Sequence, residues 1–265
     1  MLGAIFGDIV GSCYEFRNTK TKNFELFAKG CHFTDDSVMT LAVAKALLQY
    51  DGIQDTETFK DILITSMHTY GNAYPYAGYG GNFSWWLIKK CRLPYNSFGN
   101  GSAMRVSPVG WYADSLEEAL TLAEASAGVT HNHPDGIKGA VVTAGAIYLA
   151  KTGSSKDEIK QFVESYYPLD FTLDEIRPTY TFDVSCQGSV PQAMQAFLES
   201  DSFEDTIRNA VSIGGDSDTI AAIAGSVAEA FYGMNESQKE KTLSYLSDEL
   251  KEIVFEFEKK YQIKS

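Results

Sequence analysis

Cysteine and histidine are scarce in this chain of 265 residues, with four of each. The cysteines include no C-x-x-C pair and no regular spacing, so a zinc ribbon or a disulfide framework finds no support and we expect reduced core thiols. G-x-S-x-G, the lysine-bearing P-loop and a complete G-x-G-x-x-G are also missing. These absences give no support for a serine hydrolase, a P-loop NTPase or a dinucleotide-binding protein.

Basic residues are few beside acidic ones: 22 Lys and Arg against 35 Asp and Glu give a net charge of −13. This charge disfavours nonspecific nucleic-acid binding, because it repels a phosphate backbone. A phosphate-bearing small molecule stays compatible if metal ions or backbone N–H groups supply positive potential. The apolar run of residues 1–9 lacks a basic flank and contains Asp8, so we predict no signal peptide, no membrane association and a cytoplasmic location.

Helical spacing dominates the apolar pattern. Apolar residues in 38–48 recur at intervals of three and four. The Ala- and Gly-rich stretches 136–150 and 219–232 carry few charges and predict buried central helices. Capping-box patterns predict three further helix starts, at residues 115–118, 155–158 and 237–240.

Strand signals are weak and confined to two short segments. Residues 24–27 and 180–184 predict at most a minor hairpin. No alternation of strands and helices at βαβ spacing is present, which argues against a parallel sheet. Because no linker divides the chain, we predict an all-α, single-domain helical bundle over residues 1–265.

Two acidic clusters about 180 residues apart carry the strongest functional signal, residues 34–37 (TDDS) and 216–219 (DSDT). Each could cap a helix, because Asp, Ser and Thr accept hydrogen bonds from the first N–H groups. One oxygen suffices for a cap, however, and four carboxylates brought together would repel unless a cation lay between them. Such oxygen ligands suit Mg²⁺, Mn²⁺ or Ca²⁺. Spacing alone leaves caps and a shared metal site equally open.

Two glycine-rich segments, 71–82 and 96–102, interrupt the helical pattern. The simpler interpretation is tight turns that need positive φ. The functional interpretation is an anion-binding nest of backbone N–H groups, to which Ser102 adds a hydroxyl. Tyr95 and Phe98 flank the second segment as possible stacking faces for a base.

The histidines give little support for a transition-metal site. His131 and His133 are separated by one residue, but Pro134 follows and no third soft ligand is near. We predict a polar helix start here. We expect His32 and His68 to be structural residues.

The order of these motifs resembles the ADP-ribosylglycohydrolase family over about residues 1–235. The resemblance implies an orthogonal all-α bundle that cleaves the glycosidic bond between ADP-ribose and an acceptor, with two Mg²⁺ or Mn²⁺ ions at a dinuclear site. The matching segments are residues 7–15, 34–37, 78–80, 99–105, 130–131 and 214–220.

Site residues carry over from the resemblance position by position. It implies the metal ligands Thr34, Asp35, Asp36, Asp216, Asp218 and Thr219. It also implies substrate contacts from Gly78, Tyr79, Gly80, Tyr95, Phe98, Gly99, Asn100, Gly101, Ser102, Met104 and His131.

Glu15, Asp36 and Asp216 are the predicted catalytic residues. The metal ions would fix the ribose diol and activate water, while Glu15 would exchange a proton near an oxocarbenium-like centre. Glu15 resembles the mobile acidic residue of serine-directed members, which favours O-linked ADP-ribosyl-serine on protein as substrate. ADP-ribosyl-arginine hydrolysis, a silent ADP-ribose-binding member and a dinuclear phosphohydrolase stay open, as does ADP-ribosylated nucleic acid as a substrate.

Overall fold

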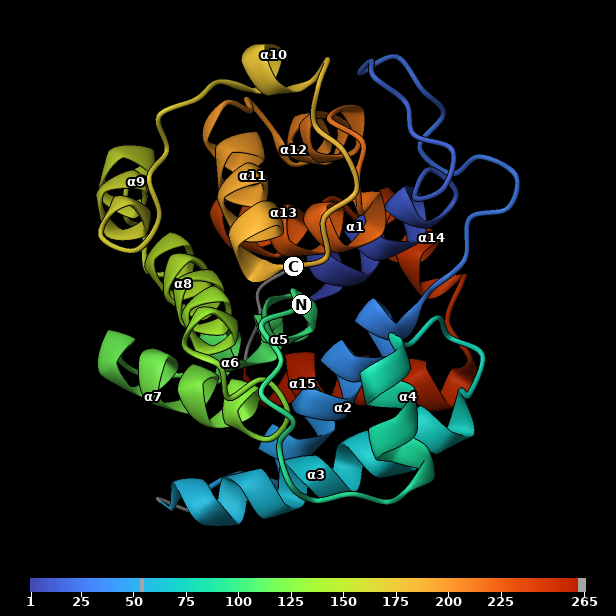
Figure 1. Ribbon diagram of the computed structural model, residues 1–265, viewed down its shortest axis with the longest axis vertical. Helices are drawn as coiled ribbons and strands as arrows, with labels where there is room; N and C mark the ends of the chain where they lie inside the picture. The colour runs from blue at the N-terminus through green and yellow to red at the C-terminus, as the bar shows by residue number, and fades with distance from the viewer. Residues whose placement is uncertain (53–54, 262–265) are drawn as a thin grey trace.

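The computed structural model describes residues 1–52 and 55–261 as helices joined by loops (Figure 1). In this part no strand forms, and one isolated bridge joins Gly99 to Ser185. The all-α prediction is therefore confirmed. The helices are α1 (Leu2–Ser12), α2 (Asp35–Tyr50), α3 (Thr56–Ala73), α4 (Gly81–Ile88), α5 (Gly101–Met104), α6 (Ser107–Tyr112), α7 (Leu116–Gly128), α8 (Pro134–Lys151), α9 (Lys156–Glu164), α10 (Leu173–Ile176), α11 (Cys186–Leu198), α12 (Phe203–Ser212), α13 (Ser217–Tyr232), α14 (Glu236–Leu243) and α15 (Asp248–Lys260).

Helices α1 and α13 pack side by side at the centre of the molecule (Figure 1). Every residue of α1 is buried. Gly3, Gly7 and Gly11 lie four residues apart, on one face of α1. A Cβ at any of them would overlap the backbone of α13. The two backbones therefore touch directly, which only glycine allows at these positions.

The predicted central helices are confirmed as α8 and α13, which pack against each other. α13 is buried from Ser217 to Glu229. The Glu229 carboxylate accepts hydrogen bonds from the N–H groups of Leu2 (3.2 Å) and Gly3 (2.8 Å). α13 thus satisfies two of the N–H groups that the start of α1 leaves unpaired.

Two of the three predicted capping sites are confirmed. Ser115 accepts a hydrogen bond from the first turn of α7, and Ser155 forms a complete capping box on α9. The third prediction was two residues too late. Asn235 and Gln238 form the box on α14, each accepting a 2.9 Å bond from the other's backbone N–H, and Ser237 lies inside the helix.

The glycine-rich segments are shorter than predicted. α3 continues through Gly71, where a Cβ would lie 2.7 Å from the Leu87 side chain. In the first loop Gly78 has a φ of 112°, as a tight turn requires. Gly99 and Gly101 do not adopt positive φ, and α5 already begins at Gly101.

The hairpin predicted from residues 24–27 and 180–184 does not form. The Tyr180 hydroxyl donates to the Gly188 carbonyl at 2.5 Å, and its own carbonyl accepts from Lys20 Nζ at 2.7 Å. These bonds tie residues 180–184 to α11 and to the loop after α1. Residues 180–184 therefore form a loop that contacts α11 and the loop after α1, not a strand.

Within the described ranges, no helix has the length and apolar character needed to cross a membrane. All four cysteines are free thiols. Only Cys186 is buried, so the prediction of core thiols holds for one of them. The Cys13 and Cys31 sulfurs lie 3.0 Å apart.

Gly7→Ala should destabilise the fold by about 3 kcal/mol, because the new methyl group must push apart two packed backbones. Gly81→Ala is the matched control. Gly81 lies in the first turn of α4, and a Cβ there would meet open space. Urea unfolding measures both variants. Equal midpoints would show that the backbone contact is dispensable.

Candidate metal centre and substrate cavity

A cavity of about 550 Å³ lies where the N-termini of α2 and α13 meet. Its volume is within the range of small-molecule sites. Both acidic clusters contribute to its wall, together with Glu15. All six predicted metal ligands line it: Thr34, Asp35, Asp36, Asp216, Asp218 and Thr219.

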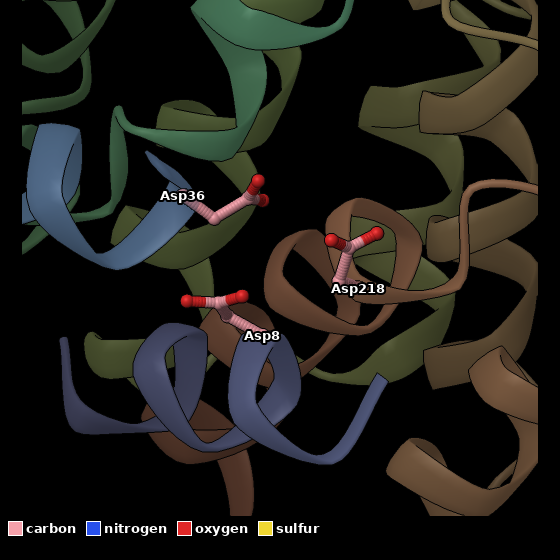
Figure 2. A group of neighbouring side chains, drawn as sticks. All are labelled: Asp8, Asp36 and Asp218. Carbon is pink, nitrogen blue, oxygen red and sulfur yellow. The ribbon is translucent and has the colours of Figure 1, made fainter. Parts of the chain in front are cut away.

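Carboxylates from three different helices converge at the wall of this cavity. Figure 2 shows Asp8 of α1, Asp36 of α2 and Asp218 of α13, which offer oxygens within 4.8 Å of one another. The Thr219 hydroxyl donates to Asp36 Oδ2 at 3.1 Å. The two acidic clusters therefore meet, although about 180 residues separate them in the sequence.

The helix-cap interpretation holds for the first cluster only. Thr34 is the N-cap of α2, and its hydroxyl accepts a hydrogen bond from the Asp36 N–H at 3.3 Å. Asp216 occupies the N-cap position of α13 but makes no side-chain cap bond. Its Oδ2 accepts instead from Asn100 Nδ2 at 2.7 Å. The surplus carboxylates are thus directed at the cavity and its wall.

These carboxylates fit a hard divalent cation. Asp36 Oδ1 and Asp218 Oδ1 are buried and have no hydrogen-bond partner among the described residues. Burial, reinforced by the neighbouring carboxylates, raises the pKa of both groups well above the usual range. The same causes raise the pKa of Asp35 to about 8. Closely spaced oxygens without protein donors are the environment that Mg²⁺ or Mn²⁺ would satisfy.

Asp8 supports the site from below, a role that the sequence interpretation missed. Its carboxylate accepts from the Thr34 N–H (2.9 Å), the Thr34 hydroxyl (2.7 Å), the Ser37 N–H (3.1 Å) and the Ser37 hydroxyl. Because these donors engage both oxygens, the carboxylate of Asp8 orients the start of α2. Asp8 is the only charged side chain in residues 1–12, and this isolation in an apolar segment could have indicated its role.

Glu15 lies beside the carboxylates of the second cluster. Its oxygens come within 4.8 Å of those of Asp216 and Asp218. Partial burial, followed by the charges of Asp216 and Asp8, raises the pKa of Glu15 to about 7. The loop after α1 thus brings a carboxyl group with an unusually high proton affinity to the edge of the cavity.

Asn18 ties the Glu15 loop to the loop before α13. Its Oδ1 accepts from the Gly215 N–H at 2.9 Å. Its Nδ2 donates to the carbonyls of Tyr14 (2.8 Å), Glu15 (2.8 Å) and Gly215 (3.0 Å). One amide side chain therefore holds Glu15 in register with the second acidic cluster. Its distant partner, Gly215, left no signal near Asn18 in the sequence.

Most predicted substrate contacts lie in the cavity wall, but three do not. The Ser102 hydroxyl donates to the Gly136 carbonyl at 2.6 Å, and the Phe98 ring packs on His133 with centroids 5.4 Å apart. Tyr79 is the third residue outside the wall, with a hydroxyl that is buried without a partner. The predicted contacts that line the cavity are Gly78, Gly80, Tyr95, Gly99, Asn100, Gly101, Met104 and His131.

Exposed aromatic side chains border the cavity, and the sequence patterns did not indicate this role for them. Phe16 is 83% exposed and stacks on Phe182 with centroids 6.1 Å apart. Tyr76 is almost fully exposed and also lines the opening.

The histidines divide into structural and cavity residues. His133 accepts a 3.1 Å bond from the Asp135 N–H at the start of α8, so the predicted polar helix start is confirmed. His68 stacks on Trp86 and is structural, as predicted. His32, expected to be structural, lines the cavity.

The fold and the sequence together define the class of this protein. The family model described as ADP-ribosylglycohydrolase matches residues 1–260, which extends the resemblance beyond residue 235. The chain belongs to this family and is a glycosidase that acts on ADP-ribosylated substrates.

Named relatives are similar over most of their length. ADP-ribosylhydrolase ARH3 of Homo sapiens is 25% identical, with 89% of this chain and 85% of that protein covered. ADP-ribosylarginine hydrolase Tri1 of Pseudomonas putida is 26% identical, with 89% and 70% covered. A solved structure described as an ADP-ribosylglycohydrolase-related protein complex superposes with a TM-score of 0.67 at 22% identity, covering 99% and 96% of the two chains. This last likeness shows the fold.

Asp218→Asn should stabilise the metal-free protein by on the order of 1 kcal/mol, because it removes one of several repelling buried charges. Saturating Mg²⁺ should stabilise the wild type by about 2.7 kcal/mol at a hundredfold excess over its dissociation constant. The variant should lose most of this gain. Denaturant unfolding in chelator and in Mg²⁺ measures both effects. A variant that kept the full Mg²⁺ gain would remove Asp218 from the ligand set.

Asn18→Ala should expose the Gly215 amide, which loses its acceptor. We expect that amide to exchange about tenfold faster, as the loss of one hydrogen bond implies. Asn23→Ala is the matched control, because Asn23 lies in the same loop, is exposed, and within the described chain makes a hydrogen bond through its backbone N–H only. Residue-resolved hydrogen exchange tests the pair, and unchanged protection in Asn18→Ala would show that the bond does not hold the loop.

Proposed function

We propose that this protein is a divalent-cation-dependent hydrolase that releases ADP-ribose from O-linked ADP-ribosyl-serine on proteins. The observation that carries the proposal is the meeting of the two acidic clusters in one cavity, with Glu15 beside them. Glycine-rich loops line the same cavity, where a nucleotide could lie close to the backbone.

Six residues are proposed to hold two Mg²⁺ or Mn²⁺ ions. Asp36 and Asp218 supply oxygens that no protein donor engages. Divalent cations at such a site neutralise the carboxylates and supply Lewis acidity for hydrolysis. Asn100 fixes the orientation of Asp216 through its 2.7 Å hydrogen bond. The full proposed set is Thr34, Asp35, Asp36, Asp216, Asp218 and Thr219.

Glu15 is the proposed proton carrier, with Asp36 and Asp216 completing the catalytic set. Cleavage of the bond to the ribose leaves an oxocarbenium-like centre and a departing oxygen that needs a proton. Glu15 lies at the cavity edge beside Asp216, where it can deliver that proton and later accept one from water. Asn18 keeps the Glu15 loop at this distance.

The proposed ligand explains how an acidic cavity accepts phosphates. The cations would offset the carboxylate charge near the ribose. The diphosphate is proposed to lie along Gly99–Gly101, with Tyr95 close to the adenine. Met104 and the loop at Gly78 would complete the wall.

Arginine-linked substrates form the second candidate. The similarity to the ADP-ribosylarginine hydrolase Tri1 favours it. The match of Glu15 to the acidic residue of serine-directed members supports serine. Both linkages would use the same ADP-ribose site and differ at the rim, where Phe16 and Phe182 would meet the acceptor.

Serine- and arginine-linked ADP-ribosyl peptides, each with Mg²⁺ or with chelator, test the substrate directly. We expect free ADP-ribose from the serine peptide in Mg²⁺ only. Asp216→Ala is the inactive control. Release from the arginine peptide alone would move the assignment to that linkage, and cleavage of neither would end the proposal. Tight binding without turnover would indicate a silent member, and released phosphate a phosphohydrolase.

Glu15→Gln should lower kcat by at least about 100-fold, the usual contribution of a general acid–base group. The stabilisation by Mg²⁺ should persist, because Glu15 lies outside the proposed ligand set. Initial rates and thermal unfolding in Mg²⁺ give the two readouts. Near-wild-type turnover would place the proton transfer elsewhere, and a lost Mg²⁺ effect would make Glu15 a ligand.

A further inference from the structure

Arg105 is a buried cation that pairs with no carboxylate among residues 1–52 and 55–261. Its side chain is 1% exposed and borders the cavity. Nη2 donates to the Ser126 carbonyl and to the Thr130 hydroxyl, both at 2.9 Å. Nε is buried and has no partner among the described residues. Buried arginines usually pair with carboxylates. Here the guanidinium instead donates hydrogen bonds to neutral oxygens of Ser126 and Thr130.

The Thr130 hydroxyl links Arg105 to His131. It is fully buried, and its Oγ1 lies 2.7 Å from His131 Nδ1. A guanidinium can only donate, so Oγ1 accepts from Arg105. In the described structure, Nδ1 is then the one acceptor within reach of the hydroxyl proton, which would otherwise be an unpaired buried donor. Thr130 therefore donates to Nδ1.

His131 consequently carries its own proton on Nε2. Burial, followed by the nearby Arg105 charge, holds the pKa of His131 well below its usual range, so the ring is neutral. Nε2 has no hydrogen-bond partner within the described chain, and it faces the glycine loop. A Cβ would lie 3.6 Å from Nε2 if built on Gly99 and 3.2 Å if built on Gly101. An N–H donor thus points at the cavity wall.

We propose that Arg105 and Thr130 are positioning residues that fix His131 as a neutral Nε2–H donor to an oxygen of ADP-ribose. The identity of the ligand rests on the proposed function, whereas the tautomer rests on the protein alone. Fixing the proton in advance lets the site favour an acceptor oxygen and disfavour a donor at the same place.

Nitrogen-15 NMR of labelled wild-type protein tests the tautomer without any substrate. The chain has four histidines, so the spectrum of His131→Ala assigns the resonances. We expect an unprotonated Nδ1 and a protonated Nε2 in His131 at neutral pH. Added ADP-ribose should shift the Nε2 signal. A protonated Nδ1, an imidazolium or an Nε2 signal that bound ADP-ribose leaves in place would overturn the proposal.

Variants of Thr130 test the relay. Thr130→Val should raise KM about tenfold, the effect of one lost hydrogen bond, with a smaller change in kcat. Thr130→Ser keeps the hydroxyl and should match the wild type. In a His131→Ala background, Thr130→Val should change KM no further. Equal KM values for the Val and Ser variants would refute the relay.

The NMR readout keeps the two proposals distinguishable. If Thr130→Val does not fold, the wild-type spectrum still decides the tautomer, and Thr130→Ala tests the need for the hydroxyl. If the wild type shows the expected tautomer but does not bind ADP-ribose, the proposed function fails and the ligand part of this inference fails with it.

Discussion

The direct contact between the backbones of α1 and α13 is the constraint on which the site depends. Asp8 follows Gly7 on α1, and Gly11 lies against the backbone at Asp218. Because no side chains separate the two helices at the glycines, Asp8 reaches the start of α2. One carboxylate oxygen from each of Asp8, Asp36 and Asp218 then lies within 4.8 Å of the others. The close packing of the α1 and α13 backbones therefore sets the positions of the carboxylates without any bound ligand.

Packing of the core holds the carboxylates together, although their proximity makes an unfavourable contribution to the free energy of folding. Their mutual repulsion and burial oppose folding, whereas the apolar length of α13 and the four hydrogen bonds to Asp8 support it. Carboxylates whose pKa values are raised by burial and by like charges cluster at functional sites. Asp36 Oδ1 and Asp218 Oδ1 are buried without a partner among the described residues, and they are the oxygens that the proposed cations would engage.

Sequence patterns within a few residues predicted much of the fold. The features that could not be predicted depend on contacts between segments that are far apart in the sequence. The cap at Ser155 lies within four residues and could be recognised, and the two acidic clusters carried enough surplus oxygen to suggest a site. The roles of Asp8 and Asn18 could not be predicted, because their partners come from segments that the sequence does not place nearby. α1 was overlooked since glycine lowers helix propensity, although its four-residue glycine spacing was visible. Residues 180–184 alternate like a strand, but tertiary hydrogen bonds determine their conformation.

The hydrogen bond from Thr219 to Asp36 joins two residues that are 183 positions apart, so forming it closes a very long stretch of chain. Closing such a loop has a large entropic cost that is recovered only when the intervening helices have packed. During synthesis, the first acidic cluster leaves the ribosome long before the second. The growing chain therefore cannot bring the two acidic clusters together until residue 219 has emerged, so the proposed cation site can form only after most of the bundle has been synthesised.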